Sequence, residues 1–115
     1  MTDEARKRLL DVMNACDAIA GFVEGKDFAV YQQSKLLRSA VERQFEIVGE
    51  ALNKAAVAEP QLGSEIPDLH RIVGLRNRLI HGYDNVDDEI LWDVVQTKLA
   101  PLRLQAAAAM RDPGP

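Results

Sequence analysis

Apolar residues recur every three or four positions along most of this 115-residue chain, and that period constrains the fold more than any other feature. No stretch alternates strictly between polar and apolar residues, as a half-buried strand would. Glycine and proline are sparse and fall between the periodic segments. The sequence therefore predicts an all-α protein, an antiparallel four-helix bundle whose helices are joined by short connections.

The first half of the chain is expected to form two long helices. Thr2 or Asp3 can cap the free backbone N–H groups at the start of the first helix, and Gly25 is expected to end it. A connection over residues 26–31 then leads into a second helix over residues 31–58. Both helices carry one apolar stripe, which we expect to face the core. The predicted stripe of the first helix comprises Leu9, Val12, Met13, Cys16, Ile19, Ala20 and Val23, and that of the second comprises Leu37, Val41, Phe45, Val48, Leu52 and Ala55.

Gly49 lies inside the second helix, where glycine costs about 1 kcal/mol relative to alanine. A glycine in that place indicates that another helix approaches closely. The face opposite the apolar stripe carries Glu42, Glu46 and Glu50. We expect these carboxylates to be solvated or to face a dimer partner.

The second half is expected to supply the other two helices. After a loop over residues 59–66, Pro67 suits the first turn of a third helix, which Gly82 is expected to end. Asp87 is expected to cap a fourth helix, and Pro101 should kink or restart it.

The length corresponds to one domain, which we expect over residues 1–112, followed by a disordered tail over residues 113–115. The single cysteine, Cys16, excludes an intrachain disulfide and falls on an apolar stripe, so we expect it in the core. The longest apolar run, residues 106–110, is far shorter than the roughly 20 residues of a membrane span. The N-terminus has no apolar signal core. These features predict a cytoplasmic protein.

The net charge of −4 and the pI of about 5.1 argue at first against a nucleic-acid-binding protein. The charge is unevenly distributed, however. From Leu69 to Tyr83 the chain holds three arginines, both of its histidines and no acidic residue. A two-fold dimer would double this basic segment in one cleft.

A motif lies within the basic segment: Arg76-Asn77-Arg78-Leu79-Ile80-His81-Gly82-Tyr83. It matches the R-x-x-x-x-H-x-Y pattern of the HEPN superfamily. Residues 42–51, the pair Ile66-Pro67, and Val86-Asp87 followed by Trp92 are also similar to that family. Over roughly residues 3–103 the chain resembles the HepT toxins of the HEPN–MNT toxin–antitoxin systems.

The resemblance implies a metal-independent endoribonuclease that works as a homodimer, with both copies of the motif meeting in the cleft between subunits. It implies that Arg76 and His81 are the catalytic pair. It also implies an MNT-type nucleotidyltransferase antitoxin, which neutralises the toxin by transferring AMP to Tyr83. The expected substrate is RNA; no DNA partner, membrane partner or cofactor is expected.

The chemistry of these residues is consistent with RNA cleavage. Without a metal, the 2′-hydroxyl must lose a proton and the leaving 5′-oxygen must gain one, and an imidazole can do either near neutral pH. An arginine fork matches the non-bridging phosphate oxygens, which gain negative charge in the transition state. Asn77 and Arg78 are candidates to bind neighbouring phosphates or a ribose hydroxyl. No metal-ligand spacing competes, because His70 and His81 are eleven positions apart and Cys16 is remote.

Helix geometry separates the two catalytic candidates. Five residues turn an ideal helix by about 140°, so Arg76 and His81 do not face the same way. Either Gly82 ends the helix and lets the imidazole swing, or a dimer brings Arg76 of one chain to His81 of the other. We expect His81 at the C-terminal edge of the third helix, where the helix dipole favours a protonated imidazole.

Alternatives remain for each residue of the motif. Tyr83 can pack against the last helix, His81 can serve as a helix cap, and Arg76 and Arg78 can be solvated surface residues. His70 lies outside the motif and is expected to be structural. The alternative function is a non-catalytic binding or regulatory partner of a nucleotidyltransferase, in which the motif is retained for binding.

Overall fold

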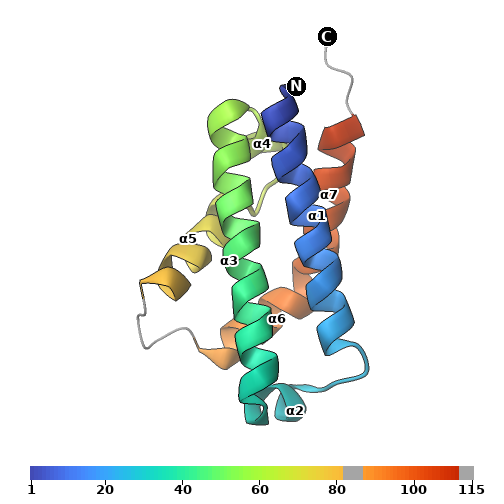
Figure 1. Ribbon diagram of the computed structural model, residues 1–115, viewed down its shortest axis with the longest axis vertical. Coiled ribbons are helices and arrows are strands. Elements are labelled where there is room, and N and C mark those ends of the chain that lie inside the picture. The colour runs from blue at the N-terminus through green and yellow to red at the C-terminus, as the bar shows by residue number, and fades with distance from the viewer. Residues whose placement is uncertain (82–86, 112–115) are drawn as a thin grey trace.

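Three long helices run side by side along the long axis of the molecule (Figure 1). In the computed structural model, which describes residues 1–81 and 87–111, they are α1 (Asp3–Val23), α3 (Lys35–Ala58) and α7 (Leu99–Arg111). α1 packs against both α3 and α7 and runs in the direction opposite to both. The predicted all-α, antiparallel bundle is therefore confirmed.

Four shorter helices complete the described structure. α5 (Leu69–Ile80) packs against α3 on the side away from α1, and α6 (Asp88–Thr97) crosses towards the start of α7 (Figure 1). α2 (Phe28–Gln33) and α4 (Leu62–Glu65) each form only one or two turns between longer elements. α5, which carries the motif, thus lies on the flank of the bundle.

The apolar stripes predicted for the long helices form the core. On α3 every residue of the predicted stripe is buried, namely Leu37, Val41, Phe45, Val48, Leu52 and Ala55. On α1, Cys16 is buried as expected, whereas Ala20 is exposed and Ala15 is buried in its place. The 3.6-residue period thus predicted the core-facing side of both helices correctly, although Met13 of the α1 stripe is only half-buried and Ala20 at its edge is exposed.

α1 begins and ends where its capping residues predict. The Oγ1 atom of Thr2 accepts a hydrogen bond from the backbone N–H of Ala5 at 3.1 Å, which satisfies one of the free donors of the first turn. Gly25, which follows the last turn, adopts a φ of 72°, a conformation that a residue with a Cβ rarely adopts.

The expected single helix over residues 31–58 is wrong, and so is the expected connection over residues 26–31. Asp27 caps the short helix α2, its side chain accepting from the N–H of Val30, and Ser34 separates α2 from α3. The Oγ atom of Ser34 accepts from the N–H of Leu37 at 3.1 Å, so α3 begins with its own cap. The chain turns at Ser34 because these local hydrogen bonds replace the helical ones.

Two boundaries in the second half also differ from the sequence-based expectation, and a third agrees with it. The expected loop over residues 59–66 contains α4, and α5 begins at Leu69, two residues after Pro67. The expected fourth helix is interrupted at Lys98, so that Pro101 lies in the first turn of α7, which confirms the predicted restart. Asp87 caps α6 as predicted, accepting from the N–H of Glu89 at 2.8 Å. Gly82 and the predicted tail over residues 113–115 lie outside the described residues.

No helix within residues 1–81 and 87–111 is long and apolar enough to cross a lipid bilayer.

Candidate active site

The motif-bearing helix α5 is held against the bundle by an apolar face and leaves a polar face exposed. Leu69, Ile72 and Leu75 are buried in the core. The opposite side of the helix presents exposed polar residues, namely His70, Arg71, Asn77, Arg78 and His81. Because no residue of α5 is acidic, this exposed face is basic along its length.

Arg76 lies on neither of these faces but at the contact between α5 and α3. A Cβ atom built on Gly49 of α3 would lie 2.1 Å from the Cβ of Arg76 and 2.6 Å from its Cγ, far inside van der Waals contact. The close approach that the mid-helix glycine predicted is therefore confirmed. The helix that approaches is α5, at the motif arginine itself. Gly49 thus makes room for the stem of Arg76.

The guanidinium group of Arg76 is held by one hydrogen bond and carries an unsatisfied donor. Its Nη1 donates to the Oδ1 of Asn77 at 2.9 Å. Its Nε is buried and finds no hydrogen-bond partner among the described residues. A buried donor without a partner costs about 1–3 kcal/mol. Such a cost is typical of a side chain that is retained for function rather than for stability.

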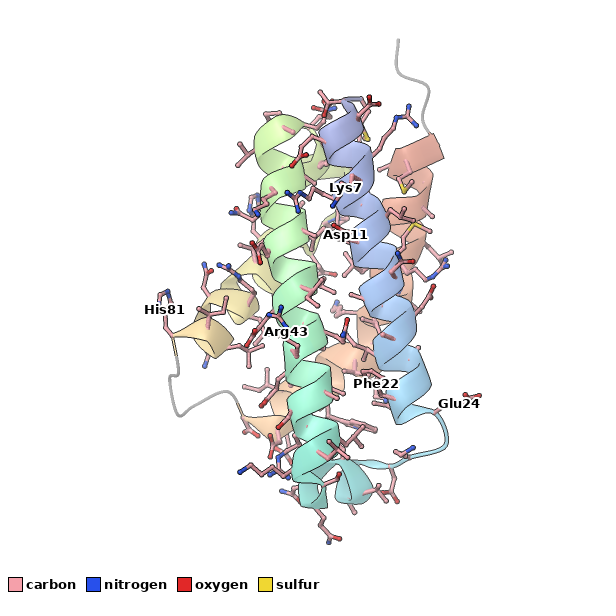
Figure 2. All side chains as sticks on the ribbon, viewed as in Figure 1. Lys7, Asp11, Phe22, Glu24, Arg43 and His81 are labelled. Atoms are coloured by element: carbon pink, nitrogen blue, oxygen red, sulfur yellow. The ribbon has the colours of Figure 1, made fainter. Side chains whose placement is uncertain are left out.

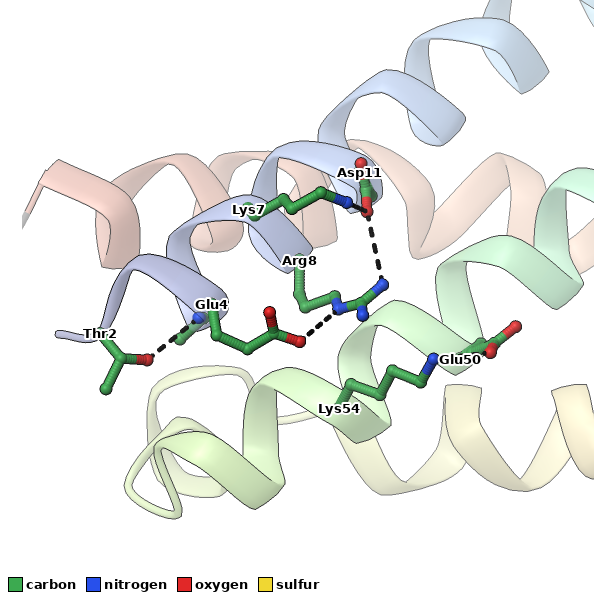
Figure 3. Close-up of polar contacts among 8 residues, drawn as sticks. Thr2, Glu4, Lys7, Arg8, Asp11, Glu50 and Lys54 are labelled. Carbon is green, nitrogen blue, oxygen red and sulfur yellow. Dashed lines mark hydrogen bonds and ion pairs between the residues drawn. The ribbon is translucent and has the colours of Figure 1, made fainter.

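The neighbouring carboxylate of Glu50 is already paired with another cation. The Nζ of Lys54 lies 3.0 Å from its Oε1, as Figure 3 shows, and this hydrogen bond is the main reason why the pKa of Glu50 is lowered. The charges of Lys54 and, more weakly, Arg76 lower it further. Lys54 thus offsets the charge of Glu50, and Arg76 keeps positive charge available for an anion.

His81 stands at the C-terminal end of α5, as predicted. Its backbone N–H donates to the carbonyl of Asn77 at 3.1 Å, and its φ and ψ of −78° and 3° end the helix. The imidazole is exposed, and Figure 2 shows it at the outer end of α5, away from α3. His81 is therefore accessible to a large substrate.

The structure does not bring Arg76 and His81 to one face of α5. Arg76 points to the α3 contact, whereas His81 lies at the exposed tip of the helix, which agrees with the rotation of about 140° expected from their spacing. The structure does bring Asn77 to Arg76, through the hydrogen bond already described. Tyr83, the expected AMP acceptor, lies outside the described residues.

One feature of this region was not predicted from the sequence. A pocket of about 270 Å³ opens between α5 and α6, and His70, Arg71 and Arg78 contribute to its lining. His70 is exposed, although it was expected to have only a structural role. The sequence signal that could have pointed to this pocket is the spacing of Arg71, Gly74 and Arg78, which places all three on one side of a helix.

The described residues contain no group of three or more His, Cys, Asp or Glu side chains that could hold a metal ion. The donors around α5 are instead guanidinium, imidazole and amide groups, which suit an anion such as a phosphate.

The sequence is similar to those of known ribonuclease families over most of its length. The family model described as "Ribonuclease HepT-like" matches residues 12–109. "Probable ribonuclease HepT" of Thermococcus cleftensis is 32% identical over 95 residues, which cover 83% of this chain and 86% of the relative. "Putative RNase MJ0125" of Methanocaldococcus jannaschii is 26% identical over 104 residues, which cover 90% of this chain and 89% of the relative. No solved structure matches the chain significantly.

Proposed function

The chain belongs to the Ribonuclease HepT-like family and is a ribonuclease, and on that premise we propose that it is a metal-independent endoribonuclease toxin that cleaves RNA with Arg76 and His81. The observation that carries this assignment is the placement of Arg76. Its stem occupies the space that Gly49 leaves, and its Nε is buried without a partner. The folded protein thus holds one guanidinium group in a fixed place even though the buried, unpaired Nε lowers its stability.

The proposed reaction is transfer of the scissile phosphate from the 5′-oxygen to the adjacent 2′-oxygen. The 2′-oxygen forms a bond to phosphorus as its proton leaves, and the bond to the 5′-oxygen breaks as that oxygen gains a proton. His81 moves one of these protons, because an imidazole can serve as acid or base near neutral pH. Arg76 binds the non-bridging oxygens, whose negative charge increases in the transition state. Asn77 and Arg78 bind the flanking parts of the RNA strand.

The separation of Arg76 and His81 on α5 supports a site formed by two copies of the chain. A histidine at the exposed tip of α5 can reach the arginine of a second copy without any rearrangement of its own helix. In a two-fold dimer each contact occurs twice, so two equivalent sites would form. We therefore propose a homodimer in which Arg76 of one subunit and His81 of the other act on one phosphate.

The resemblance to HEPN–MNT toxins supports a further, finer proposal about regulation. An MNT-type nucleotidyltransferase antitoxin would transfer AMP to Tyr83, two residues after His81 in the sequence. The added phosphate would compete with RNA for the same arginines, because both ligands present anionic oxygens. The bulk of the nucleotide would also block access to His81.

The ribonuclease proposal is tested with the purified full-length protein and total RNA in the presence of EDTA. We expect cleavage by the wild type and a loss of roughly 10²–10⁴-fold in His81→Ala, the range typical of general acid–base groups. Lys26→Ala is the control, because Lys26 is an exposed cation on the connection between α1 and α2, remote from α5 (Figure 1). Cleavage that survives unchanged in His81→Ala would refute the proposed role of this residue.

The regulatory proposal is tested separately by intact mass spectrometry. The protein is expressed with and without an MNT-type nucleotidyltransferase, and we expect the mass of one AMP to be added only in its presence. The addition should be absent from Tyr83→Phe. If the co-expressed wild type shows no added mass, the AMP switch is wrong, while the ribonuclease proposal is unaffected.

A further inference from the structure

We propose that the pocket between α5 and α6 binds one nucleotide of the RNA strand, at a distance from His81. The inference rests on the proposed ribonuclease function and adds a substrate subsite to it. Arg71 and Arg78 lie seven residues apart, so they share a side of α5, and both contribute to the lining of the pocket together with His70. A rise of 1.5 Å per residue separates Arg71 from His81 by about 15 Å along the helix. An RNA strand that reaches His81 along α5 therefore passes the pocket.

The lining of the pocket combines the two chemistries of a nucleotide. α6 contributes apolar side chains, Ile90 and Val94, and Leu75 of α5 adds to them. These side chains can accommodate the faces of a base, and guanidinium planes can stack on it. The cations of Arg71 and Arg78 match the phosphate that follows the base in the strand. The acidic residue just before α5, Asp68, is paired with Lys98 at 3.7 Å, which reduces its repulsion of a phosphate.

Gly74 leaves space on the α5 side of the pocket. It lines the pocket, and a Cβ atom built on it meets nothing within 4 Å. Gly49 has a steric reason in the fold, namely Arg76, whereas Gly74, like Gly21, has room for a side chain. A side chain added at Gly74 would therefore narrow the pocket from the side of α5.

Charge argues for RNA rather than a second copy of the chain as the occupant. If a two-fold axis passed through the pocket, Arg71 of both subunits would lie close together, and like charges repel. The proposed dimer contact at His81 lies about 15 Å further along α5. An RNA strand carries the complementary charge, one negative phosphate for each nucleotide. The geometry therefore points to a nucleotide unit of the substrate strand.

The first test fills the pocket without removing any charge. Gly74→Leu and the matched control Gly21→Leu are made in a His81→Ala background, so that a short fluorescein-labelled single-stranded RNA stays intact. Gly21 is also helical, and a Cβ atom on it also meets nothing within 4 Å, so both substitutions gain the same helix propensity. We expect Gly74→Leu to weaken RNA binding about tenfold, as loss of one stacked base does, and Gly21→Leu to leave it unchanged.

The second test removes one charge and leaves the pocket open. Arg71→Ala should weaken RNA binding. It should also make the negative slope of log K against log salt shallower by about 0.7, the contribution of one phosphate contact to single-stranded RNA. Lys26→Ala, which removes an exposed charge elsewhere, should leave the slope unchanged. Arg71 is exposed, so this test decides the question even if Gly74→Leu does not fold.

The outcomes separate the pocket from the ribonuclease activity. If wild-type cleavage depends on His81 while Gly74→Leu and Arg71→Ala bind RNA like their controls, the pocket inference is overturned and the proposed function stands. If the two variants bind RNA normally but no longer capture the nucleotidyltransferase, the pocket is a protein-docking surface, which also overturns the inference. Weaker RNA binding by both variants, with both controls unchanged, supports the subsite even if cleavage itself is not detected.

Discussion

Gly49 and Arg76 form the most constrained residue pair near the site, and they lead to a prediction. Replacing Gly49 by alanine places a Cβ atom 2.1 Å from that of Arg76, so α3 and α5 must move apart. We expect Gly49→Ala to lower the free energy of unfolding by about 1–3 kcal/mol, as overpacking does. RNA cleavage should also fall, because the displaced stem carries the guanidinium group with it. Chemical unfolding and single-turnover cleavage measure the two effects.

Making Gly49→Ala in an Arg76→Ala background shows whether Gly49 acts on cleavage by positioning Arg76 or only through the stability of the fold. In Arg76→Ala the Cβ atom remains, so Gly49→Ala should still cost stability, but it should reduce the residual cleavage no further. Gly21→Ala is the control and should gain up to about 1 kcal/mol, because its new Cβ atom meets nothing. If Gly49→Ala is as stable as Gly21→Ala, the packing described for Arg76 is incorrect.

Cys16 gives a prediction about reactivity. Its side chain is buried in the core, and burial, with a smaller contribution from the charge of Asp17, raises its pKa to about 12. At pH 8 the reactive thiolate is therefore scarce and inaccessible. Native protein incubated with iodoacetamide should keep its mass, whereas protein in concentrated urea should gain one carbamidomethyl group. Rapid alkylation of the native protein would show that Cys16 is not in the core.

The sequence predicted the local geometry around the candidate site residues better than their tertiary surroundings. The spacing of Arg76 and His81 was enough to predict that they point in different directions, because helix rotation depends only on residue number. The glycine at position 49 was enough to predict a close contact, but only the fold shows that its partner is Arg76. The spacing of Arg71, Gly74 and Arg78 indicates only one wall of the pocket, because the pocket itself requires α6 to be placed against α5.

At the scale of elements, the break at Ser34 shows where tertiary packing overrides local pattern. Apolar residues at positions 28–31 and 36–37 flank a polar run over residues 32–35, and the predicted helix over residues 31–58 continued through that run. The observed turn lets α2 place Tyr31 against Trp92 of α6, with ring centroids 5.1 Å apart, and Phe28 also contacts Trp92. These contacts join residues more than 60 positions apart, and no local pattern encodes them.

The same corner of α2, α3 and α6 leads to a prediction about pH. The pKa of Glu42 on α3 is raised above the usual 4.5, mainly because the side chain is partly buried. The charge of Asp88 on α6 and, more weakly, that of Glu46 raise it further, whereas Arg38 lowers it. The folded protein then binds more protons than the unfolded chain, so stability falls as pH rises from about 4.5 through the raised pKa. Glu42→Gln should remove this loss.

The expected gain for Glu42→Gln at pH 7 is a few tenths of a kcal/mol, because the side chain is only partly buried. Urea unfolding at pH 4 and pH 7 measures it. Glu24→Gln, which removes the same charge at an exposed site, is the control. A larger loss of stability for Glu42→Gln than for Glu24→Gln at pH 7 would show that the ionised carboxylate stabilises this corner.

At the scale of the whole molecule, the arrangement of charge matters more than its sum. The net charge of −4 is typical of a protein that does not bind nucleic acid, yet α5 contains no acid and exposes Arg71, Arg78 and His81 on the flank of the bundle. The acidic remainder repels RNA, so a strand is favoured along this helix. An isolated basic helix of this kind binds weakly, and a second copy of the chain would double the basic surface.

The proposed division of each site between two subunits makes a quantitative prediction. Arg76→Ala and His81→Ala should each retain only residual cleavage alone, since each homodimer lacks one group in both sites. When the two variants are unfolded together and refolded, half of the dimers contain one of each chain. One of the two sites in such a dimer then has both Arg76 and His81, so activity should return to about a quarter of the wild-type value. If both groups instead acted within one chain, every site in the mixed dimer would lack one of them, and the refolded mixture would retain only the residual cleavage.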